Sequence, residues 1–282
     1  MIVLDMQTMM TLDAHQHFWQ FEPVRDAWIS AEMAELRRDF LPADLAPVLQ
    51  QNGMDGCVAV QADQSETETR FLLDLAAQNP FIRAVVGWVD LRADEVEARL
   101  EYWSQFPRLR GVRHILQGEP PAFMLDPAFL RGIRALGKKG LTYDILVFPR
   151  HLRTVRVFLQ KFENQKFILD HAGKPYLKKG LIVQWKKDMQ NLARHENLWC
   201  KVSGLVTEAN WKDWKAADFR PYLDVVFEAF GSQRVVYGSD WPVCLLAASY
   251  AEQKALLADY IASFSPSEQA AFWGGNGADF YQ

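Results

Sequence analysis

Eight short apolar segments recur along the chain, and their spacing is the feature that most restricts the fold. Their first residues lie 25 to 44 positions apart, which is about the length of a strand followed by a helix. Several are nearly continuous in Val, Ile and Leu, as expected for parallel strands that are covered on both faces. The segments are Leu12–Phe18, Gly56–Gln61, Ala84–Leu91, Leu109–Leu116, Leu141–Phe148, Lys166–His171, Leu198–Ser203 and Arg234–Ser239.

Helical patterns fill the gaps between these segments. Ser65-Glu66-Thr67-Glu68 is a predicted capping box, and Asp126-Pro127 predicts a second helix that begins at a capping residue followed by proline. Eight alternating units without a Pro/Ser/Gly-rich linker predict an α/β fold, a single (β/α)8 TIM barrel over residues 10–282, after an N-terminal extension of residues 1–9. A doubly wound open sheet is the alternative. That fold carries a Gly-rich turn after its first strand, where this chain has His15-Gln16-His17.

Composition and charge restrict the classes of partner that we expect for the protein. The 282 residues are 49% hydrophobic and 23% charged, with a net charge of −4 and no basic block, so we expect no nucleic-acid partner. The three cysteines are far apart, which argues against a disulfide framework and a cysteine zinc site and fits a reducing compartment. The first ten residues lack the long apolar run of a signal peptide or a membrane span. We therefore expect a cytoplasmic protein without a membrane partner.

Two histidines at the end of the first predicted strand are the clearest sign of chemistry. Side chains alternate along a strand, so His15 and His17 project to the same side. Two neighbouring imidazoles there form half of a metal site or a polar clamp for a reacting water. The alternative is two polar residues at a strand end without a function, and the rest of the chain has to decide between them.

Polar residues also gather at the ends of other predicted strands, where TIM-barrel enzymes place their catalytic groups. His171 and Lys174 follow the sixth strand, and Asp240 follows the eighth. Two or three histidines with one aspartate form a plausible ligand set for zinc or a similar divalent ion that keeps one position open for water. The same carboxylate could instead accept the proton of that water as general base. Nearby Arg and Lys side chains suit a substrate rich in oxygen, or an oxyanion.

Four motifs, taken together, resemble a known family. They are Asp13-Ala14-His15-Gln16-His17-Phe18-Trp19, Gly111-Val112-Arg113-His114, Asp170-His171-Ala172-Gly173-Lys174-Pro175 and Gly238-Ser239-Asp240-Trp241-Pro242. Their order and spacing are similar to the amidohydrolase superfamily, and more narrowly to its amidohydrolase 2 branch, which includes sugar-lactone hydrolases of the L-fuconolactonase and L-rhamnonolactonase type. The resemblance spans the chain from His15 to the closing Asn276–Tyr281 segment. It implies a metal-dependent hydrolase fold and the opening of a small sugar lactone to its aldonic acid.

The resemblance also implies roles for particular residues. His15, His17, His171 and Asp240 would be metal ligands, and Asp240 would deprotonate the attacking water. Our own interpretation as a lactone hydrolase adds that His171 or Lys174 would help the ring alkoxide to leave. Two-metal members of the superfamily use a lysine or glutamate on strand four and a histidine on strand five, where this chain offers Arg113-His114 and Asp144. We therefore expect at most one divalent ion, zinc before others, and the resemblance also allows a metal-free site.

The remaining candidates have competing interpretations. Only one of the adjacent Arg113 and His114 can point into the barrel mouth, and we favour His114 as a catalytic residue, with Arg113 as a candidate for substrate binding. Lys174 either binds a lactone oxygen or caps its loop. Asp144 either lines the pocket or pairs with Arg113 inside the barrel. Asp170 precedes His171 and is expected to face the helices.

Aromatic residues near the strand ends are candidates for sugar contacts. Among the ten tryptophans, Trp19 and Trp241 flank the expected site, and we favour them over Trp88 as ligand contacts, although large aromatic residues more often belong to a core. The sequence shows no obvious hydrophobic slot in the site. The best interpretation is a hydrolase that opens a sugar lactone. The alternatives are a metal-dependent decarboxylase, a muconolactone or pyrone lactonase of the same barrel family, and a non-catalytic barrel that binds sugar acids.

Overall fold

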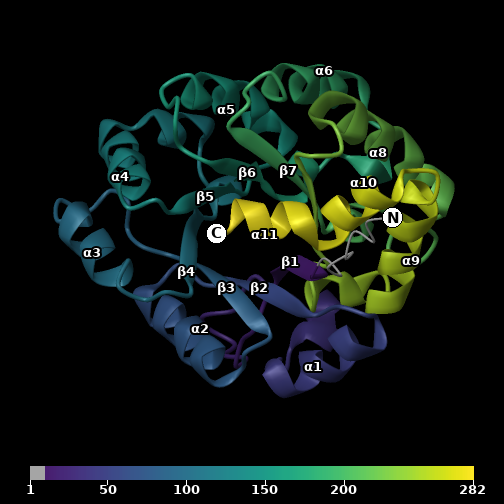
Figure 1. Cartoon of the computed structure of the whole chain (residues 1–282), viewed down its shortest axis with the longest axis horizontal. Helices are drawn as coiled ribbons and strands as arrows, with labels where there is room; N and C mark the ends of the chain where they lie inside the picture. Colours follow the sequence, from purple (N-terminus) through teal and green to yellow (C-terminus); the bar gives the residue numbers. More distant parts are fainter. Residues whose placement is uncertain (1–9) are drawn as a thin grey trace, which may run out of the picture.

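A barrel of eight parallel strands forms the centre of the molecule (Figure 1). The structure, a computed structural model, describes residues 10–282, and the predicted extension 1–9 lies outside the described residues. Each strand pairs in parallel with the next one along the chain, so the predicted (β/α)8 barrel is confirmed. The strands are β1 Leu12–Gln16, β2 Gly56–Val60, β3 Ile82–Gly87, β4 Leu109–His114, β5 Thr142–Ile145, β6 Phe167–Leu169, β7 Leu198–Val202 and β8 Val235–Tyr237.

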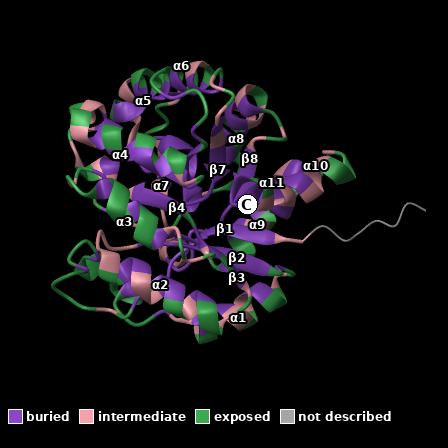
Figure 2. Ribbon diagram, turned by 60° about the vertical axis from the view of Figure 1, so that its left-hand side comes forward, coloured by how far each residue is buried: buried purple, intermediate pink, exposed green. Residues whose placement is uncertain are grey.

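Helices surround the barrel and cover its outer face. The longer ones are α1 Pro42–Gln51, α2 Glu66–Gln78, α3 Val96–Trp103, α4 Pro127–Lys138, α5 Leu152–Leu159, α6 Val183–Leu192, α8 Ala216–Phe230 and α9 Tyr250–Ile261. The shorter ones are α7 Leu205–Glu208, α10 Pro266–Ala270 and α11 Asn276–Phe280. Figure 2 shows buried strands inside and exposed residues along the outer faces of the helices. Between residues 10 and 282, no helix is both long and apolar enough to cross a membrane.

Both predicted helix N-termini are confirmed, but the predicted capping box at Ser65 is incomplete. Asp126 caps α4 by accepting a hydrogen bond from the Ala128 amide at 2.7 Å. Ser65 caps α2 in the same way, with the Glu68 amide as donor at 3.1 Å. The Glu68 side chain does not complete the expected box, because its Oε1 accepts from the Ala62 amide at 3.1 Å and so ties α2 to the loop that follows β2.

The inside of the barrel has an apolar end and a polar end. Phe280, the last residue of α11, and Tyr281, which follows it, fill the apolar end. Helix α11 lies across the barrel in Figure 1. The two aromatic residues pack against a set of small and branched side chains from five strands: Leu12, Ala14, Val58, Val60, Ala84, Val86, Ile168 and Val236. The Tyr281 hydroxyl donates a hydrogen bond to Asp144 Oδ2 at 2.6 Å, where the apolar end meets the polar one.

The barrel closes between β1 and the segment that follows β8. The amide of His17 donates to the carbonyl of Trp241 at 2.7 Å, and the amide of Asp240 donates to the carbonyl of His15 at 2.8 Å. Side chains reinforce this seam, because the buried Asp13 carboxylate accepts from the Ser239 amide at 2.8 Å and from the Tyr250 hydroxyl at 3.1 Å. The two strand ends that carry candidate residues are thus held directly against one another.

The segment before α11 yields a test of this packing. Gly274 lies in a π-helical turn, Ala271–Gly275, and a Cβ there would lie 1.9 Å from the Met10 carbonyl oxygen. Gly274→Ala is therefore expected to lower the free energy of unfolding by roughly 1–3 kcal/mol, the usual cost of overpacking. Gly118→Ala is the matched control, because a Cβ at that position meets no atom within 4 Å. Urea unfolding of both variants measures the difference, and equal stability would contradict the close approach.

Candidate active site

An irregularity in β1 aims the first histidine pair. Between the pairs Asp13–Cys57 and Gln16–Ala59, β1 carries one residue more than β2, as in a β-bulge. The additional residue breaks the strict alternation of faces. Ala14 packs in the apolar interior, while His15 and His17 point into the polar end of the barrel.

A left-handed turn after β6 aims the second group of site residues. His171, Ala172, Gly173 and Lys174 all have positive φ, at 54°, 49°, 68° and 50°. Such conformations are costly for residues other than glycine and are commonly found at functional sites. Because the chain leaves the regular strand here, Asp170 and His171 both face the barrel interior. The prediction that Asp170 faces the helices is therefore wrong.

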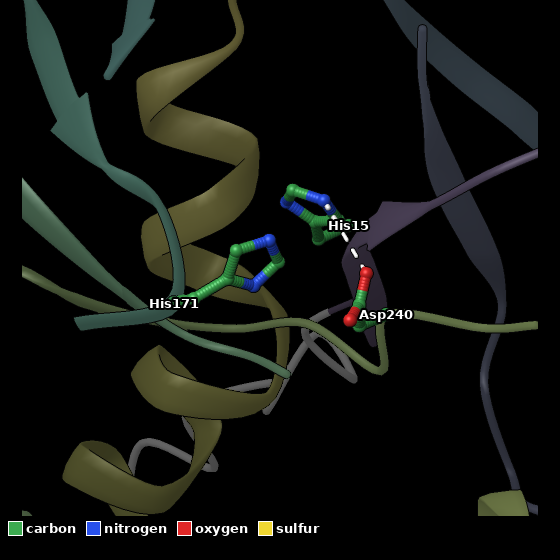
Figure 3. Close-up of side chains that lie close together, drawn as sticks. All are labelled: His15, His171 and Asp240. Atoms are coloured by element: carbon green, nitrogen blue, oxygen red, sulfur yellow. Dashed lines mark ion pairs between the residues drawn. The ribbon is translucent and has the colours of Figure 1, made fainter. Parts of the chain in front are cut away.

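Three predicted site residues converge on one point. His15, His171 and Asp240 are buried, and each offers one ligand atom within 4.8 Å of the other two (Figure 3). His17 lies beside this group, with its Nε2 3.3 Å from His15 Nε2 and 3.3 Å from Asp240 Oδ1. The structure thus brings together all four residues that the sequence nominated as metal ligands, with His17 at the edge of the set.

Glycines make room for this convergence. Gly204, with φ of 60°, lies so close that a Cβ would be 2.6 Å from His171 Nδ1 and 2.9 Å from Asp240 Oδ2. A Cβ at Gly238 would be 2.6 Å from the Cβ of His15. Any side chain at these two positions would displace a histidine of the cluster.

Hydrogen bonds behind the cluster orient its imidazoles. His17 Nδ1 lies 2.7 Å from the Val60 carbonyl oxygen. Because that oxygen only accepts, the Nδ1 of His17 carries a proton, and this contact turns its Nε2 toward Asp240 Oδ1. His171 Nδ1 lies 2.9 Å from the Ser203 hydroxyl. Partners of this kind are typical of metal-binding histidines, where they fix the tautomer and the ring orientation.

Burial sets the protonation states of the cluster. It lowers the pKa of His171 to about 4 and that of His15 well below its ordinary value. Both imidazoles are therefore neutral at neutral pH, which is the form that binds metals. For Asp240, burial opposes ionisation, but the pull of His171 and a hydrogen bond with His17 outweigh it and hold the pKa below its ordinary range. Asp240 is consequently an anion that can accept a proton.

Four buried charges lie directly beneath the cluster. Lys201 Nζ lies 2.7 Å from Asp144 Oδ2 and 2.9 Å from Asp170 Oδ1, and Arg113 Nη1 donates to Asp170 Oδ2 at 3.0 Å. Asp144 therefore pairs with Lys201, and not with Arg113 as one interpretation of the sequence had it. Lys201 was not nominated as a site residue. Its position in the middle of a strand, between the outward-facing Cys200 and Val202, was the available signal.

The orientation of the Arg113-His114 pair is the reverse of the expected one. Arg113 faces the barrel mouth and donates to Gln61 Oε1 at 3.1 Å. His114 points outward, stacks on Phe123 with ring centroids 4.8 Å apart, and accepts a 3.3 Å hydrogen bond from the Trp88 indole. The structure therefore gives no support to a catalytic role for His114.

The two favoured tryptophans also lie outside the mouth. Trp19 is buried and donates its indole proton to the Arg38 carbonyl at 2.9 Å, and Trp241 packs edge-on against Phe40. Neither lines the cavity. Trp28, from the loop between β1 and α1, lines it instead and remains 45% exposed. Its position far from any strand end gave no sequence signal.

A cavity of about 210 Å³ opens over the cluster. Its polar lining consists of His17, Arg113, Gln117, His171, Lys174 and Asp240, and its apolar lining of Trp28, Ala62, Ile115, Leu146 and Val243. The expectation that the site lacks a hydrophobic slot is therefore wrong. Lys174 reaches the cavity while its Nζ lies 3.5 Å from Glu208 Oε1, so the ammonium group is held at the rim by an ion pair.

Comparisons with known proteins agree with this geometry. The L-fucono-1,5-lactonase of Burkholderia multivorans (strain ATCC 17616 / 249) is 42% identical, over 96% of this chain and 95% of that protein. The enzyme of the same name from Burkholderia ambifaria is 37% identical, over 96% of this chain and 95% of its own. A crystal structure of a Burkholderia multivorans amidohydrolase with bound zinc superposes with a TM-score of 0.93 at 42% identity, covering 96% of this chain and 99% of that one.

A family model covers almost the whole barrel as well. The model described as amidohydrolase matches residues 12–282, from the first residue of β1 to the end of the chain. The family resemblance of the four motifs is thereby confirmed, and the chain belongs to the amidohydrolase family.

Proposed function

We propose that this protein hydrolyses a small sugar lactone of the L-fucono-1,5-lactone type to its aldonic acid. The observation that carries the proposal is the convergence of His15, His171 and Asp240 under a cavity with both polar and apolar walls. The relatives that match nearly the whole chain are named lactonases. Their names favour lactone hydrolysis over the decarboxylase and binding-only alternatives.

The donor set suits one divalent ion. His15, His171 and Asp240 are buried, and each offers one ligand atom within 4.8 Å of the other two. Imidazole nitrogens with one carboxylate are typical zinc ligands, and zinc is the ion in the related crystal structure. We infer that His15, His171 and Asp240 hold the ion, with His17 adjacent. When bound, zinc supplies a Lewis acid that polarises the lactone carbonyl.

Three residues of the chain then have separate roles in ring opening. The Asp240 carboxylate accepts a proton from the water that attacks the carbonyl carbon. The bond between that carbon and the ring oxygen breaks, and the Lys174 ammonium at the cavity rim donates a proton to the departing oxygen. Arg113 faces the same space and offers hydrogen bonds to hydroxyl or carbonyl oxygens.

The two walls of the cavity match the two faces of a deoxy-sugar lactone. Gln117, Arg113 and Lys174 can hydrogen-bond ring hydroxyls. Ile115 and Leu146 supply an apolar surface for C–H groups and for a methyl substituent. A site built in this way selects against substrates that leave its buried polar groups unpaired.

The substrate class is tested by comparing two kinds of lactone. We expect L-fucono- and L-rhamnono-lactones to exceed unsubstituted valerolactone by about 10²-fold or more in kcat/KM, because only the sugar lactones satisfy the polar wall. Acid release is followed at equal substrate concentrations well below saturation. Equal rates with valerolactone would show that the hydroxyls are not recognised.

The general base is tested by Asp240→Asn, which keeps the size of the side chain and removes its proton acceptor. We expect kcat to fall by roughly 10²-fold or more, the range for loss of general-base assistance. Glu119→Gln is the matched control, because this carboxylate pairs with the outward-facing His114 and does not line the cavity. An Asp240→Asn variant that folds normally and retains activity within a few-fold would place the base elsewhere.

The metal proposal is tested by counting bound ions. Protein dialysed against zinc is expected to retain one zinc ion per chain by mass spectrometry, because His15, His171 and Asp240 offer the ligand atoms of a single centre. His171→Asn should reduce this content, whereas His114→Asn should not, because His114 points away from the cavity. A content of two ions per chain, or a His171→Asn variant that retains zinc fully, would contradict the assignment.

A further inference from the structure

The cavity over the cluster has one large aromatic ring in its lining, that of Trp28. Trp28 is 45% exposed and is the most exposed of the ten tryptophans of the chain. Binding cavities commonly combine an aromatic wall with a few polar groups, because an aromatic ring offers a large apolar contact area. Ring opening as proposed above uses polar residues of this lining and leaves the indole without a role.

The loop between β1 and α1 holds the backbone on both sides of Trp28. Asp26 and Ile29 are buried, and the Ile29 amide donates to the Asp26 carbonyl at 2.8 Å. The Asp26 carboxylate accepts from the Glu22 amide at 2.8 Å, and the Ile29 carbonyl accepts from Arg37 Nη1 at 2.8 Å. The position of Trp28 is therefore fixed by its neighbours, although its own side chain lies at the open cavity.

A second tryptophan fixes the orientation of the indole. The rings of Trp28 and Trp19 meet edge to face, with centroids 6.0 Å apart and planes at 84°. Trp19 is itself buried, and its amide and carbonyl pair with those of Phe40 at 3.0 and 2.9 Å. The indole of Trp28 is thus held in place before a ligand arrives, so covering it with a ligand costs little side-chain entropy.

The stereochemistry of the proposed substrate supplies a matching surface. In L-fucono-1,5-lactone the hydrogens on C3, C4 and C5 all lie on one face of the ring, and the C4 hydroxyl lies on the other. Inverting C4 moves its hydrogen to the opposite face and breaks this apolar patch. The face of an aromatic ring is the negative part of its quadrupole, so it attracts the weakly positive hydrogens of such a patch. The hydroxyls remain available to polar groups of the lining such as Arg113 and Gln117.

We propose that Trp28 determines the stereochemical preference of the enzyme, by stacking its indole on the face of the lactone ring that carries the C3, C4 and C5 hydrogens. The enzyme then prefers 1,5-lactones with the C4 configuration of L-fuconolactone over their C4 epimers. The inference rests on the lactonase function proposed above and narrows its substrate class. Trp28 contacts the substrate and takes no part in proton transfer, so its loss acts on the comparison of the epimers.

The test compares L-fucono-1,5-lactone with its C4 epimer, 6-deoxy-L-glucono-1,5-lactone. The ratio of kcat/KM for the two lactones is measured in the wild type and in Trp28→Leu, Trp28→Phe and Trp88→Leu. We expect the wild type to favour the L-fucono epimer and Trp28→Leu to reduce this ratio by about 3- to 10-fold, the range that one aromatic contact contributes. Trp28→Phe keeps an aromatic face and should retain most of the ratio. Trp88→Leu is the matched control, because Trp88 donates to His114 and lies outside the cavity.

A binding measurement on the wild type does not depend on the folding of any variant. The compound 1,5-anhydro-L-fucitol has the same ring face as L-fuconolactone but no carbonyl group, so it binds without being hydrolysed. We expect it to inhibit lactone hydrolysis competitively, with an inhibition constant about 3- to 10-fold lower than that of its C4 epimer.

The remaining outcomes contradict the inference in distinguishable ways. Equal rates with both epimers in the wild type, or equal inhibition by the two anhydro sugars, would overturn it and leave the lactonase function standing. A Trp28→Leu variant that slows both epimers alike would make the indole a general wall of the cavity and would also overturn it. The same would follow if Trp88→Leu, or Trp28→Phe, reduced the ratio as much as Trp28→Leu. A wild type that hydrolyses neither lactone would overturn the proposed function and this inference together.

Discussion

The barrel closes through backbone hydrogen bonds that belong to the site residues themselves. The amide of Asp240 donates to the carbonyl of His15, and the amide of His17 donates to the carbonyl of Trp241. Closing the sheet therefore places two imidazoles beside the carboxylate without any further loop. Burial raises the pKa of Asp13 to about 6, although Ser239 and His15 donate hydrogen bonds to it. The seam thus contains a buried acid whose donors come from both strand ends.

A neutral layer of charges separates this seam from the apolar end of the barrel. Two cations, Lys201 and Arg113, balance two carboxylates, Asp144 and Asp170, and all four are buried. Buried ion pairs of this kind contribute little net stability, but removing one partner is strongly destabilising, by about 3–5 kcal/mol. The contacts of this layer connect the site with the apolar end of the barrel. It contacts His15 from below, while Tyr281 from the apolar end donates to Asp144.

Much of this architecture follows from the sequence by simple rules. Continuous Val and Ile runs at strand-helix spacing predict the barrel, and the rule that function lies at strand ends predicts His15, His171 and Asp240. Alternation along a regular strand is the rule that fails. The bulge in β1 and the left-handed turn after β6 turn His15 and His171 to the same side as Ala14 and Asp170, which no periodicity reveals.

The sequence also could not decide between adjacent residues of similar chemistry. Alternation allows only one of Arg113 and His114 to face inward, but it does not say which, and the choice depends on the register of β4 with its neighbours. Trp28 was missed because its loop is placed by tertiary packing against Trp19. Lys201 could have been found, since a charge in the middle of a buried strand needs a partner inside the barrel.

The central claim is that one ion is held at the barrel seam by residues from β1, the turn after β6 and the segment after β8. Anomalous diffraction at the zinc edge, from crystals grown with zinc and an aldonic acid product, tests it most directly. The account predicts a single peak bonded to His15, His171 and Asp240, with the product carboxylate beside it in the cavity. A peak elsewhere, two peaks bridged by a side chain of β4, or product bound away from Asp240 would contradict it.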